Sequence, residues 1–322
     1  MKQFLYIALW FVRAKFFRIK KPLQSVIFIT NCCDLSCKHC SVYEHLHPIS
    51  KPTKQIREEL EFAYQKGSRF VDFEGGEPIL WKDEDKTVND LILIAKQIGF
   101  FSCTITTNAQ TPFKNCLADS IWVSLDGVGE VHNAIRGKGT FEKLEKNSSE
   151  CGHNQLSANM VINSQNYTNV AQTVEYVKNS PHIKSISLNF HTPYIGTEYL
   201  FLDWEKRAKI VDEVLEMKKS GYPIMNSKSG LKLMKHNKFK KQCWVSNFIL
   251  ADGTRLDECP GKSANVCDRC GYGMASEMKS VFAFKPDTLL AGMRLRVKKS
   301  MDSENHFSIN PQTPPPHGQK SP

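Results

Sequence analysis

The sequence has no long apolar run. None reaches the ~18 consecutive apolar residues that a membrane-spanning helix needs, so no such helix is expected. It shows no solenoid-like repeat, and no small-residue cleavage site of a signal peptide follows its first apolar stretch. Hydrophobic residues at 41% and charged residues at 24% are near the average for a folded protein, which excludes a wholly disordered or fibrous chain. The 322 residues suffice for roughly two domains.

Cysteine, by contrast, is abundant. The chain has 11 cysteines, an odd total that makes a poor disulfide framework. Without a signal peptide, these thiols predict a reduced, cytoplasmic protein that uses cysteine for metal binding or redox chemistry. Four cysteines fall within residues 32–40 and four within residues 243–270, whereas Cys103, Cys116 and Cys151 are scattered. We interpret the scattered ones as small core residues and the two groups as two sites.

Positive charge is in excess. Lys plus Arg is 43 against 33 for Asp plus Glu, giving +10, which indicates an anionic partner. Nucleic acid is not expected, because the basic residues are spread along the chain and no nucleic-acid-binding motif is present. Part of the excess follows the apolar stretch 4–12. Residues 4–21 therefore predict either a helix that lies on an anionic membrane surface or one that packs on the domain, and the sequence leaves both open.

Strand-like and helix-like segments alternate from residue 26 to residue 219. Strands are expected at 26–30, 70–73, 102–106, 121–125, 159–163 and 183–190, and helices at 53–66, 88–98, 141–147, 170–179 and 204–219. This alternation predicts an α/β fold with right-handed βαβ units and a parallel sheet, with functional groups at the carboxyl ends of the strands. We divide the chain into an N-terminal helix (1–22), a core (23–220), a cysteine-rich region (221–297) and a polar, proline-rich disordered tail (298–322).

The first cysteine group follows directly on the first strand. Cys33, Cys37 and Cys40 have the spacing Cys-x3-Cys-x2-Cys. Three thiolates can wrap one face of a cubane iron–sulfur cluster and leave its fourth iron open for a ligand, whereas an electron-carrying cluster usually has four cysteines. A zinc site is the alternative, with its fourth ligand supplied by a neighbour. The neighbours that could supply it are Cys32, His39, His45 and His47.

Further motifs follow the next strands in order: Gly75-Gly76-Glu77-Pro78, Thr107-Asn108 and Ser124-Leu125-Asp126-Gly127. Together with the three cysteines this series resembles the radical S-adenosylmethionine (SAM) superfamily, over residues 24 to about 204. The resemblance implies a partial (β/α)6 TIM barrel with a small C-terminal iron–sulfur extension. It also implies a [4Fe-4S] cluster that binds SAM and cleaves it reductively to a 5′-deoxyadenosyl radical. A reducing partner such as flavodoxin or ferredoxin is then required.

The resemblance also implies SAM-binding roles for individual residues. Glu77 and its backbone would face the methionine ammonium, Arg136 the methionine carboxylate, and Asp126 with Ser124 the ribose hydroxyls. The same side chains could instead cap helices and stabilise turns and loops. His39 stands where an aromatic residue often contacts adenine. The full expected cofactor-binding set is His39, Gly75, Gly76, Glu77, Pro78, Thr107, Asn108, Ser124, Asp126, Arg136, Asn163 and Asn189.

The second cysteine group supplies four thiolates. Cys243, Cys259, Cys267 and Cys270 flank or follow a predicted hairpin at 248–254 that turns over Asp-Gly. Four cysteines suit a fully ligated iron–sulfur cluster and suit tetrahedral zinc equally well. The family resemblance favours the cluster, because many radical SAM enzymes carry a C-terminal cysteine-rich (SPASM or twitch) extension with auxiliary [4Fe-4S] clusters.

The motifs identify the cofactor chemistry and not the substrate. The apolar, basic N-terminus and the closing Cys-x2-Cys-Gly are similar in layout to the adenosyl-hopene transferase branch, which implies a hydrophobic, lipid or isoprenoid substrate. A peptide- or protein-modifying maturase is the alternative. A non-catalytic metal-binding module for nucleic acid is a different class, which the sequence disfavours. His191 and Tyr194, after the sixth strand, could contact substrate or could stabilise their loop.

Overall fold

The strands form one curved sheet. The computed structural model describes residues 2–42 and 47–291, so His45 and the tail expected at 298–322 lie outside the described residues. Eight strands follow the order β10-β9-β1-β2-β5-β6-β7-β8, and β3 and β4 form a separate small ribbon. The strands are β1 (Gln24–Thr30), β2 (Phe70–Gly75), β3 (Lys82–Asp83), β4 (Lys86–Thr87), β5 (Ser102–Thr107), β6 (Ser120–Ser124), β7 (Leu156–Ile162), β8 (Ile186–Phe190), β9 (Ser246–Ile249) and β10 (Arg255–Leu256).

The sheet is parallel except at one edge. Neighbouring strands from β1 to β8 pair in parallel, β9 pairs in parallel with β1, and β10 is antiparallel to β9. The strands are buried along nearly their whole length, as expected for a parallel sheet covered on both faces. The predicted α/β fold with a parallel sheet is therefore confirmed.

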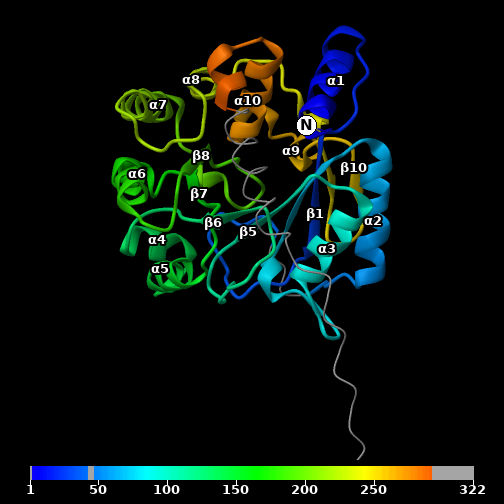
Figure 1. Ribbon diagram of the computed structural model, residues 1–322. Helices are drawn as coiled ribbons and strands as arrows, with labels where there is room; N and C mark the ends of the chain where they lie inside the picture. The colour runs from blue at the N-terminus through cyan, green and yellow to red at the C-terminus, as the bar shows by residue number, and fades with distance from the viewer. Residues whose placement is uncertain (1, 43–46, 292–322) are drawn as a thin grey trace, which may run out of the picture.

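Helices stand around the strands (Figure 1). They are α1 (Lys2–Phe16), α2 (Thr53–Lys66), α3 (Val88–Ile98), α4 (Glu130–Arg136), α5 (Thr140–Glu150), α6 (Val170–Asn179), α7 (Trp204–Lys219), α8 (Lys228–Met234), α9 (Pro260–Ser263) and α10 (Gly273–Phe282). The bounds of α2, α3, α6 and α7 match the expected residues. Clear end signals explain this agreement: Gly67 and Gly99 end α2 and α3 at positive φ, and the Asp203 side chain caps α7.

The cysteine-rich region contributes to the same sheet as the core. The expected hairpin is present as β9 and β10, with Gly253 at its turn. β9 then pairs with β1, where Ser25 Oγ donates a hydrogen bond of 2.5 Å to Asn247 Oδ1. The polypeptide next returns to the opposite edge, because Phe190 N at the end of β8 donates to the carbonyl of Gly271 at 2.9 Å. Residues 243–271 thus contact both edge strands of the core sheet, β1 and β8.

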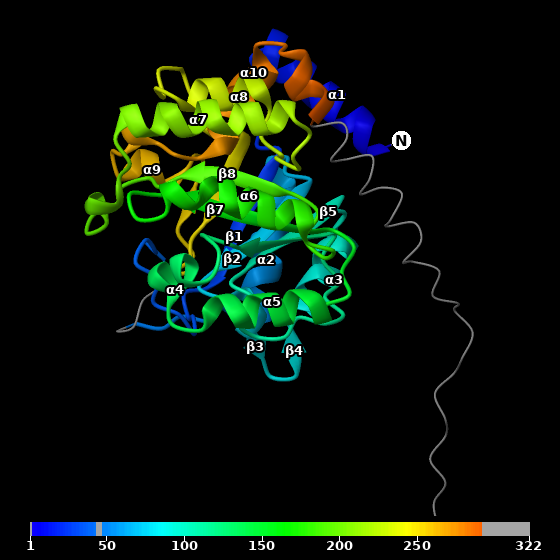
Figure 2. The same cartoon turned by 90° about the vertical axis from the view of Figure 1, so that its left-hand side faces the viewer.

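Helix α1 packs at the amino ends of the strands. The Tyr6 hydroxyl donates to the carbonyl of Gly67 just before β2, and Trp10 Nε1 donates to the carbonyl of Lys21 before β1 at 2.7 Å. Trp10 also contacts Trp244 and Phe282, so α1 and α10 lie side by side (Figures 1 and 2). Within the described part of the chain, no helix is long and apolar enough to cross a membrane.

Candidate functional site

The first cysteine loop lies at the carboxyl end of β1, at the opposite end of the sheet from α1. Cys33 and Cys37 are half-buried, and Cys40 is exposed. The loop is tied to its surroundings through the backbone: Lys38 N donates to the carbonyl of Ile135 in α4 at 3.1 Å, and Cys40 N donates to the carbonyl of Cys37 at 3.0 Å. The structure therefore brings the three expected ligand residues onto one short, anchored loop.

Two glycines hold this loop against the end of β2. Gly76 N donates to the carbonyl of Thr30 at 2.8 Å, and Glu77 N donates to the carbonyl of Cys32 at 2.8 Å. A Cβ at Gly75 would lie 2.0 Å from the carbonyl oxygen of Thr30, and one at Gly76 would lie 1.9 Å from that of Cys32. Glycine is therefore required here for close approach of the two backbones, and this approach fixes the residue that precedes Cys33.

The Glu77 carboxylate joins the end of β2 to the end of β5. It accepts hydrogen bonds from Thr107 Oγ1 at 2.7 Å, Asn108 N at 2.7 Å and Ile79 N at 3.0 Å. Burial raises the pKa of Glu77 to about 7 despite these donors. Pro78 begins the short 3₁₀ turn that Glu77 caps, Pro78–Leu80. The carboxylate supports the loop, and its expected contact with a methionine ammonium stays a prediction.

The thiols of Cys33 and Cys37 each have a hydrogen-bond donor beside them. Asn108 Nδ2 donates to Cys33 Sγ at 3.5 Å and to Asp34 Oδ1 at 2.7 Å, and Arg136 Nη1 lies 3.8 Å from Cys37 Sγ. Burial raises the pKa of Cys33 to about 12 and also raises that of Cys37, so both are protonated thiols at neutral pH. Bound iron would deprotonate them, and the adjacent amide and guanidinium donors would then face thiolates. This donor set fits an anionic metal–thiolate cluster.

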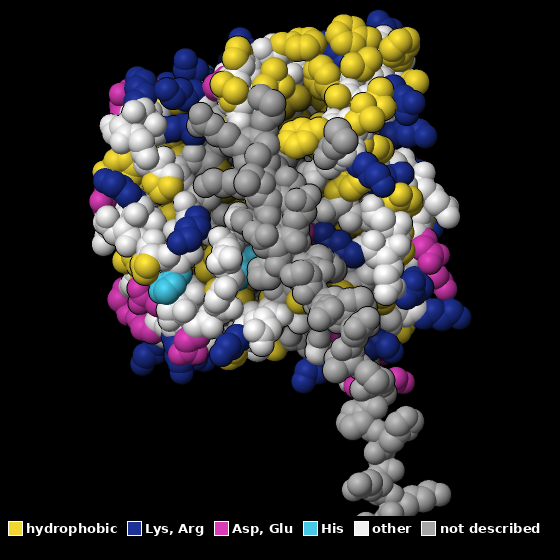
Figure 3. All heavy atoms as spheres, viewed as in Figure 1, with side chains coloured by type: hydrophobic (Ala, Val, Ile, Leu, Met, Phe, Trp, Pro, Cys, Tyr) yellow, Lys and Arg dark blue, Asp and Glu magenta, His cyan; other side chains and the backbone are white. Residues whose placement is uncertain are grey.

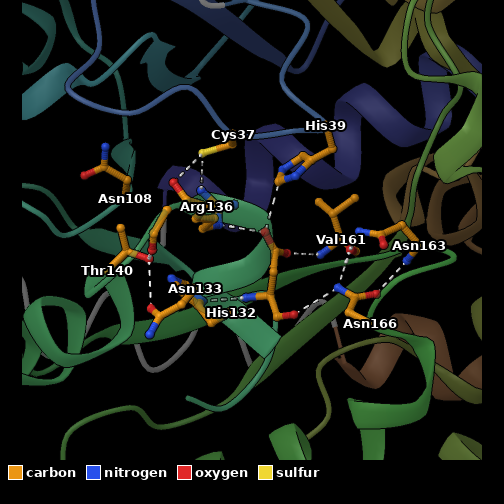
Figure 4. A network of polar contacts seen from close by, with 12 residues as sticks. Cys37, His39, Asn108, His132, Asn133, Arg136, Thr140, Val161, Asn163 and Asn166 are labelled. Carbon is orange, nitrogen blue, oxygen red and sulfur yellow. Dashed lines mark hydrogen bonds and ion pairs between the residues drawn. The ribbon is translucent and has the colours of Figure 1, made fainter. Parts of the chain in front are cut away.

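A buried ionic network connects Cys37 to the ends of β6 and β7 (Figure 4). Arg136 Nε donates to Asp126 Oδ2 at 2.6 Å, and Val161 N donates to Asp126 Oδ1 at 2.8 Å. Burial alone would raise the pKa of Asp126, but Arg136 and other donors hold it below its ordinary value. The expected pairing of Arg136 with a methionine carboxylate and of Asp126 with ribose stay predictions, since the structure shows the two residues paired with each other.

His39 faces this network with one nitrogen free. Its Nε2 lies 3.7 Å from Asp126 Oδ2, whereas Nδ1 is buried and has no hydrogen-bond partner among the described residues. Burial lowers the pKa of His39 to about 4, so the ring is neutral at pH 7. A buried neutral imidazole with an unpaired polar atom fits the expected role of contacting adenine.

Supporting residues that the sequence did not reveal complete the network. His132 Nδ1 accepts from Asp126 N at 3.2 Å, and Asn166 Nδ2 donates to the carbonyl of Asp126 at 2.9 Å. Asp34, whose Oδ1 accepts a hydrogen bond from Asn108 Nδ2, is the third supporting residue. His132 lies in the His-x3-Arg segment before Arg136, a helical spacing that places both on one face and that could have signalled this role.

Three other expected residues have different surroundings. Ser124 ends β6 and is buried beside Asp126. The Asn163 side chain closes a turn, with Oδ1 accepting from Gln165 N at 2.8 Å. Asn189 Nδ2 donates to Asn159 at 2.7 Å, while its Oδ1 accepts from Gly273 N at 2.7 Å, so it fixes the start of α10 against β8. The side chains of Asn163 and Asn189 are therefore engaged by the protein.

The four cysteines of the second group line one small cavity. Its walls are Cys243, Cys259, Cys267 and Cys270 together with Thr192, Lys241, Gly261, Val266 and Tyr272. Gly261 N donates to Cys259 Sγ at 3.4 Å. Burial raises the pKa of Cys243 to about 11 and that of Cys259 to about 12. Across residues 2–42 and 47–291, no three His, Cys, Asp or Glu side chains are arranged to hold a single metal ion.

A buried arginine lies behind the second cavity. Arg207 of α7 is 1% exposed, and its Nη2 donates to the carbonyl of Cys270 at 3.1 Å. Its guanidinium lies over the rings of Phe190 at 4.3 Å and Trp204 at 5.0 Å. Nε and Nη1 have no partner among the described residues, and burial lowers the pKa of Arg207 to about 10. The sequence analysis did not identify this residue.

The loop after β8 runs between the two cysteine sites. Its His191 ring lies 6.5 Å from that of His39, and its Nε2 contacts Thr197 Oγ1 at 3.0 Å. The Tyr194 hydroxyl lies 3.3 Å from that of Tyr272, which lines the second cavity. Both residues expected to contact substrate thus belong to a segment that faces the two sites, although both have partners within the protein.

Comparison with known proteins agrees with this geometry. Residues 27–177 match the family model of the Radical SAM superfamily. Residues 27–177 thus have the sequence pattern of a radical SAM domain. The cofactors of such a domain are a [4Fe-4S] cluster and SAM, and the loop of Cys33, Cys37 and Cys40 fits them. Among curated proteins, none matches the chain in sequence.

Solved radical SAM structures share the fold over most of the chain. Streptococcus suis SuiB bound to S-adenosylmethionine has a TM-score of 0.61 and 18% identity, covering 85% of this chain and 68% of that one. SuiB bound to the precursor peptide SuiA has a TM-score of 0.59 and 17% identity, covering 88% and 69%. anSMEcpe with bound AdoMet and the Cp18Cys peptide has a TM-score of 0.56 and 16% identity, covering 83% and 81%. The expected partial barrel is therefore confirmed.

Proposed function

We propose that the chain is a radical SAM enzyme that cleaves SAM reductively and modifies a peptide or protein. The observation that carries the first part is the cysteine loop, with Asn108 and Arg136 donating to the thiols of Cys33 and Cys37. When bound, a [4Fe-4S] cluster supplies the single electron that cleaves SAM. An external one-electron donor of the flavodoxin or ferredoxin class would supply the cluster.

This chain's own residues have separable tasks around the cofactors. Gly76 and Glu77 hold the loop in place through the backbone, and Arg136 with Asn108 offsets the negative charge of the thiolates. His39, neutral at pH 7, offers an unpaired nitrogen to a nucleobase. Asp126 orients Arg136 toward Cys37 and is itself fixed by Val161 N.

The second cysteine group would hold an auxiliary [4Fe-4S] cluster. Arg207 supports a strongly anionic occupant, because a buried guanidinium without a carboxylate partner is unfavourable unless negative charge lies nearby. A [4Fe-4S] cluster with four thiolates and zinc with four thiolates both carry net negative charge. The likeness to SuiB and anSMEcpe over both regions of the chain favours the iron–sulfur cluster.

A peptide substrate is favoured by two observations. SuiB and anSMEcpe, which share the fold, were both solved with peptides bound. In this chain the apolar segment that suggested a lipid substrate lies at the amino ends of the strands, away from the cysteine loop. The layout resemblance to the adenosyl-hopene branch, with its lipid or isoprenoid substrate, stays a prediction.

Anaerobic reconstitution tests the proposal. The chain is loaded with iron and sulfide, reduced with dithionite in the presence of SAM, and assayed for 5′-deoxyadenosine by mass spectrometry. The wild type should form this product, and Cys33→Ala, Cys37→Ala and Cys40→Ala should not. Cys32→Ala is the matched control: its thiol adjoins the motif without belonging to it, so it should retain the product.

Product formation by the three motif variants would refute the assignment. Iron content separates the two readings of the second site, because two cubane clusters give about eight irons per chain, whereas about four irons with one zinc would identify a zinc site. The substrate class is tested by incubating the enzyme with a peptide library and, separately, with isoprenoid lipids. The class that contains the substrate should acquire a mass change that depends on SAM.

A further inference from the structure

Helix α1 has two apolar faces, and only one of them is covered. Tyr6, Trp10 and Ala14 follow one another at helical spacing and pack on the body of the protein. The other face carries Leu5, Leu9, Val12 and Phe16, spaced by four, three and four residues, with exposures of 61%, 46%, 40% and 64%. The outward stripe therefore has the period of an amphipathic helix, and the described residues leave most of it exposed.

The apolar surface continues beyond the helix. Phe17 and Ile19, just after α1, are 68% and 47% exposed, and Phe284, which follows α10, is 47% exposed. Phe284 contacts the ring of Phe11 at a centroid distance of 5.3 Å, which joins the end of α10 to α1. Figure 3 shows apolar side chains gathered over α1 and α10 at the top of the molecule, with basic side chains at the edges. We call the exposed part of this surface, which consists of Leu5, Leu9, Val12, Phe16, Phe17, Ile19 and Phe284, the α1 face.

The charged residues of the segment that carries α1 have one sign. Residues 2–21 contain six basic residues (Lys2, Arg13, Lys15, Arg18, Lys20 and Lys21) and no acidic residue. Arg18 and Lys20 are exposed at the end of the helix, next to Phe17 and Ile19. A second protein surface would commonly offer mixed charges, whereas an apolar stripe on a segment whose charged residues are all basic complements a negatively charged, apolar-cored surface.

A basic cavity adjoins the same face. It lies between α8 and α10, has a volume of about 370 Å³, and is lined by Ser229, Lys232, Leu233, Lys279, Ser280, Ala283 and Lys285. Three of these seven are lysines, and the buried Ser280 Oγ has no hydrogen-bond partner among the described residues. Ala283 of the cavity lies between Phe282, which packs on Trp10, and Phe284 of the α1 face. The end of α10 is thus shared by an apolar surface and a cation-lined hollow.

We propose that the α1 face docks on an anionic phospholipid bilayer. The stripe of α1 would lie among the upper acyl chains, the basic residues of the segment would contact the headgroups, and the lysine cavity would receive a lipid phosphate. This attachment is peripheral, and it is independent of the chemistry proposed for the cysteine sites. It places one specific surface of the molecule, the amino end of the sheet, against the lipid.

Vesicle co-sedimentation of the full chain tests the proposal. The chain should sediment with phosphatidylcholine vesicles that contain phosphatidylglycerol, and much less with phosphatidylcholine alone. Leu9→Glu with Phe16→Glu should weaken binding about tenfold or more, because both side chains leave the lipid. The matched control is Leu93→Glu with Leu117→Glu, which makes the same charge change at exposed leucines away from α1 (41% and 50% exposed) and should bind like the wild type within about twofold.

A separate double variant tests the lysine cavity. Lys279→Gln with Lys285→Gln should weaken binding to the anionic vesicles by more than it weakens the slight binding to phosphatidylcholine, because both lipids carry a phosphate but only phosphatidylglycerol adds net negative charge. Circular dichroism confirms that each variant is folded. The proposal is overturned if the wild type ignores anionic vesicles, or if the two glutamate pairs lose binding equally. A third result would also overturn it: light scattering shows a dimer that Leu9→Glu with Phe16→Glu dissociates, and the wild type does not bind vesicles. A second copy of the chain would then cover the α1 face.

Discussion

Replacing Arg207 should have opposite effects on the empty and the loaded protein. In the empty protein its guanidinium is 1% exposed and has one hydrogen bond, to the carbonyl of Cys270. The neighbouring thiols are protonated, because burial raises the pKa of Cys243 to about 11 and that of Cys259 to about 12. The empty protein thus contains a buried cation without a counter-charge. Arg207→Met, which fills a similar volume with an uncharged chain, should stabilise it.

The size of the effect follows from the surroundings of the guanidinium. Burial lowers the pKa of Arg207 to about 10, and at about 1.4 kcal/mol per pKa unit the buried cation is destabilised by about 3 kcal/mol. Cation–π contact with the rings of Phe190 and Trp204 stabilises the guanidinium by about 1–2 kcal/mol. The net gain expected for Arg207→Met is therefore about 1–2 kcal/mol in the free energy of unfolding, measured by anaerobic urea unfolding of the chelator-stripped protein.

The loaded protein should respond in the other direction. A cluster at the second site brings four thiolates, for which Arg207 is the nearest buried counter-charge, so its loss should release the cluster more readily. Iron transfer to a chelator should be about tenfold faster in Arg207→Met, which corresponds to a loss of about 1.4 kcal/mol in the stabilisation of the bound cluster. The measurement uses a background of Cys33→Ala, Cys37→Ala and Cys40→Ala, so that only the second site holds iron.

Arg69 supplies the matched control. Its guanidinium also lies over an aromatic ring, 3.5 Å from the centre of Tyr64, but its Nη1 donates to two backbone carbonyls and it lies at the amino end of β2. Arg69→Met should destabilise the empty and the loaded protein alike. The reasoning is refuted if Arg207→Met also destabilises the empty protein, or if it leaves the rate of iron release unchanged.

Three further predictions concern the first site. Gly76→Ala places a Cβ 1.9 Å from the carbonyl before the first motif cysteine and should abolish iron loading there. Gly196→Ala also has an unfavourable φ, +85°, which costs about 1–2 kcal/mol, but its Cβ meets nothing within 4 Å beyond its chain neighbours, so it should still load iron. Arg136→Gln removes the counter-charge of the buried Asp126 and should lower the free energy of unfolding, measured in urea, by about 3–5 kcal/mol. Burial lowers the pKa of His132 to about 3 in the folded protein, against 6.5 in the unfolded chain, so stability is lost as the pH falls below 6.5. His132→Asn should therefore remove about 2 kcal/mol of the difference in unfolding free energy between pH 7 and pH 5.

Local signals in the sequence were sufficient for much of the fold. The ends of α2, α3 and α7 are marked by Gly67, Gly99 and Asp203, whose conformational and capping preferences act within one turn of the chain. The placement of polar motifs after strands was predictable too, because the carboxyl ends of parallel strands meet at one edge. The first cysteine loop and its neighbours Asn108 and Arg136 follow from that rule.

Long-range pairing was not predictable in the same way. β9 lies beside β1, and the contact between Ser25 and Asn247 joins residues that are far apart in sequence, so no local pattern specifies it. Arg207 was missed for another reason. It stands in a helix rich in charged residues, although its spacing of three and seven residues from Ile210 and Val214 places it on the buried face and could have identified it.

The position of α1 bears on where a substrate can come from. α1 covers the amino ends of β1 and β2, and the cysteine loop lies at their carboxyl ends, so the sheet separates the two. A molecule resting on a bilayer through α1 turns its reactive end toward the aqueous phase. A lipid would have to leave the bilayer and pass around the body of the protein to react, whereas a peptide emerging at the membrane surface would meet the site directly. Attachment would therefore raise the local concentration of the enzyme near such peptides and would select against substrates that remain embedded.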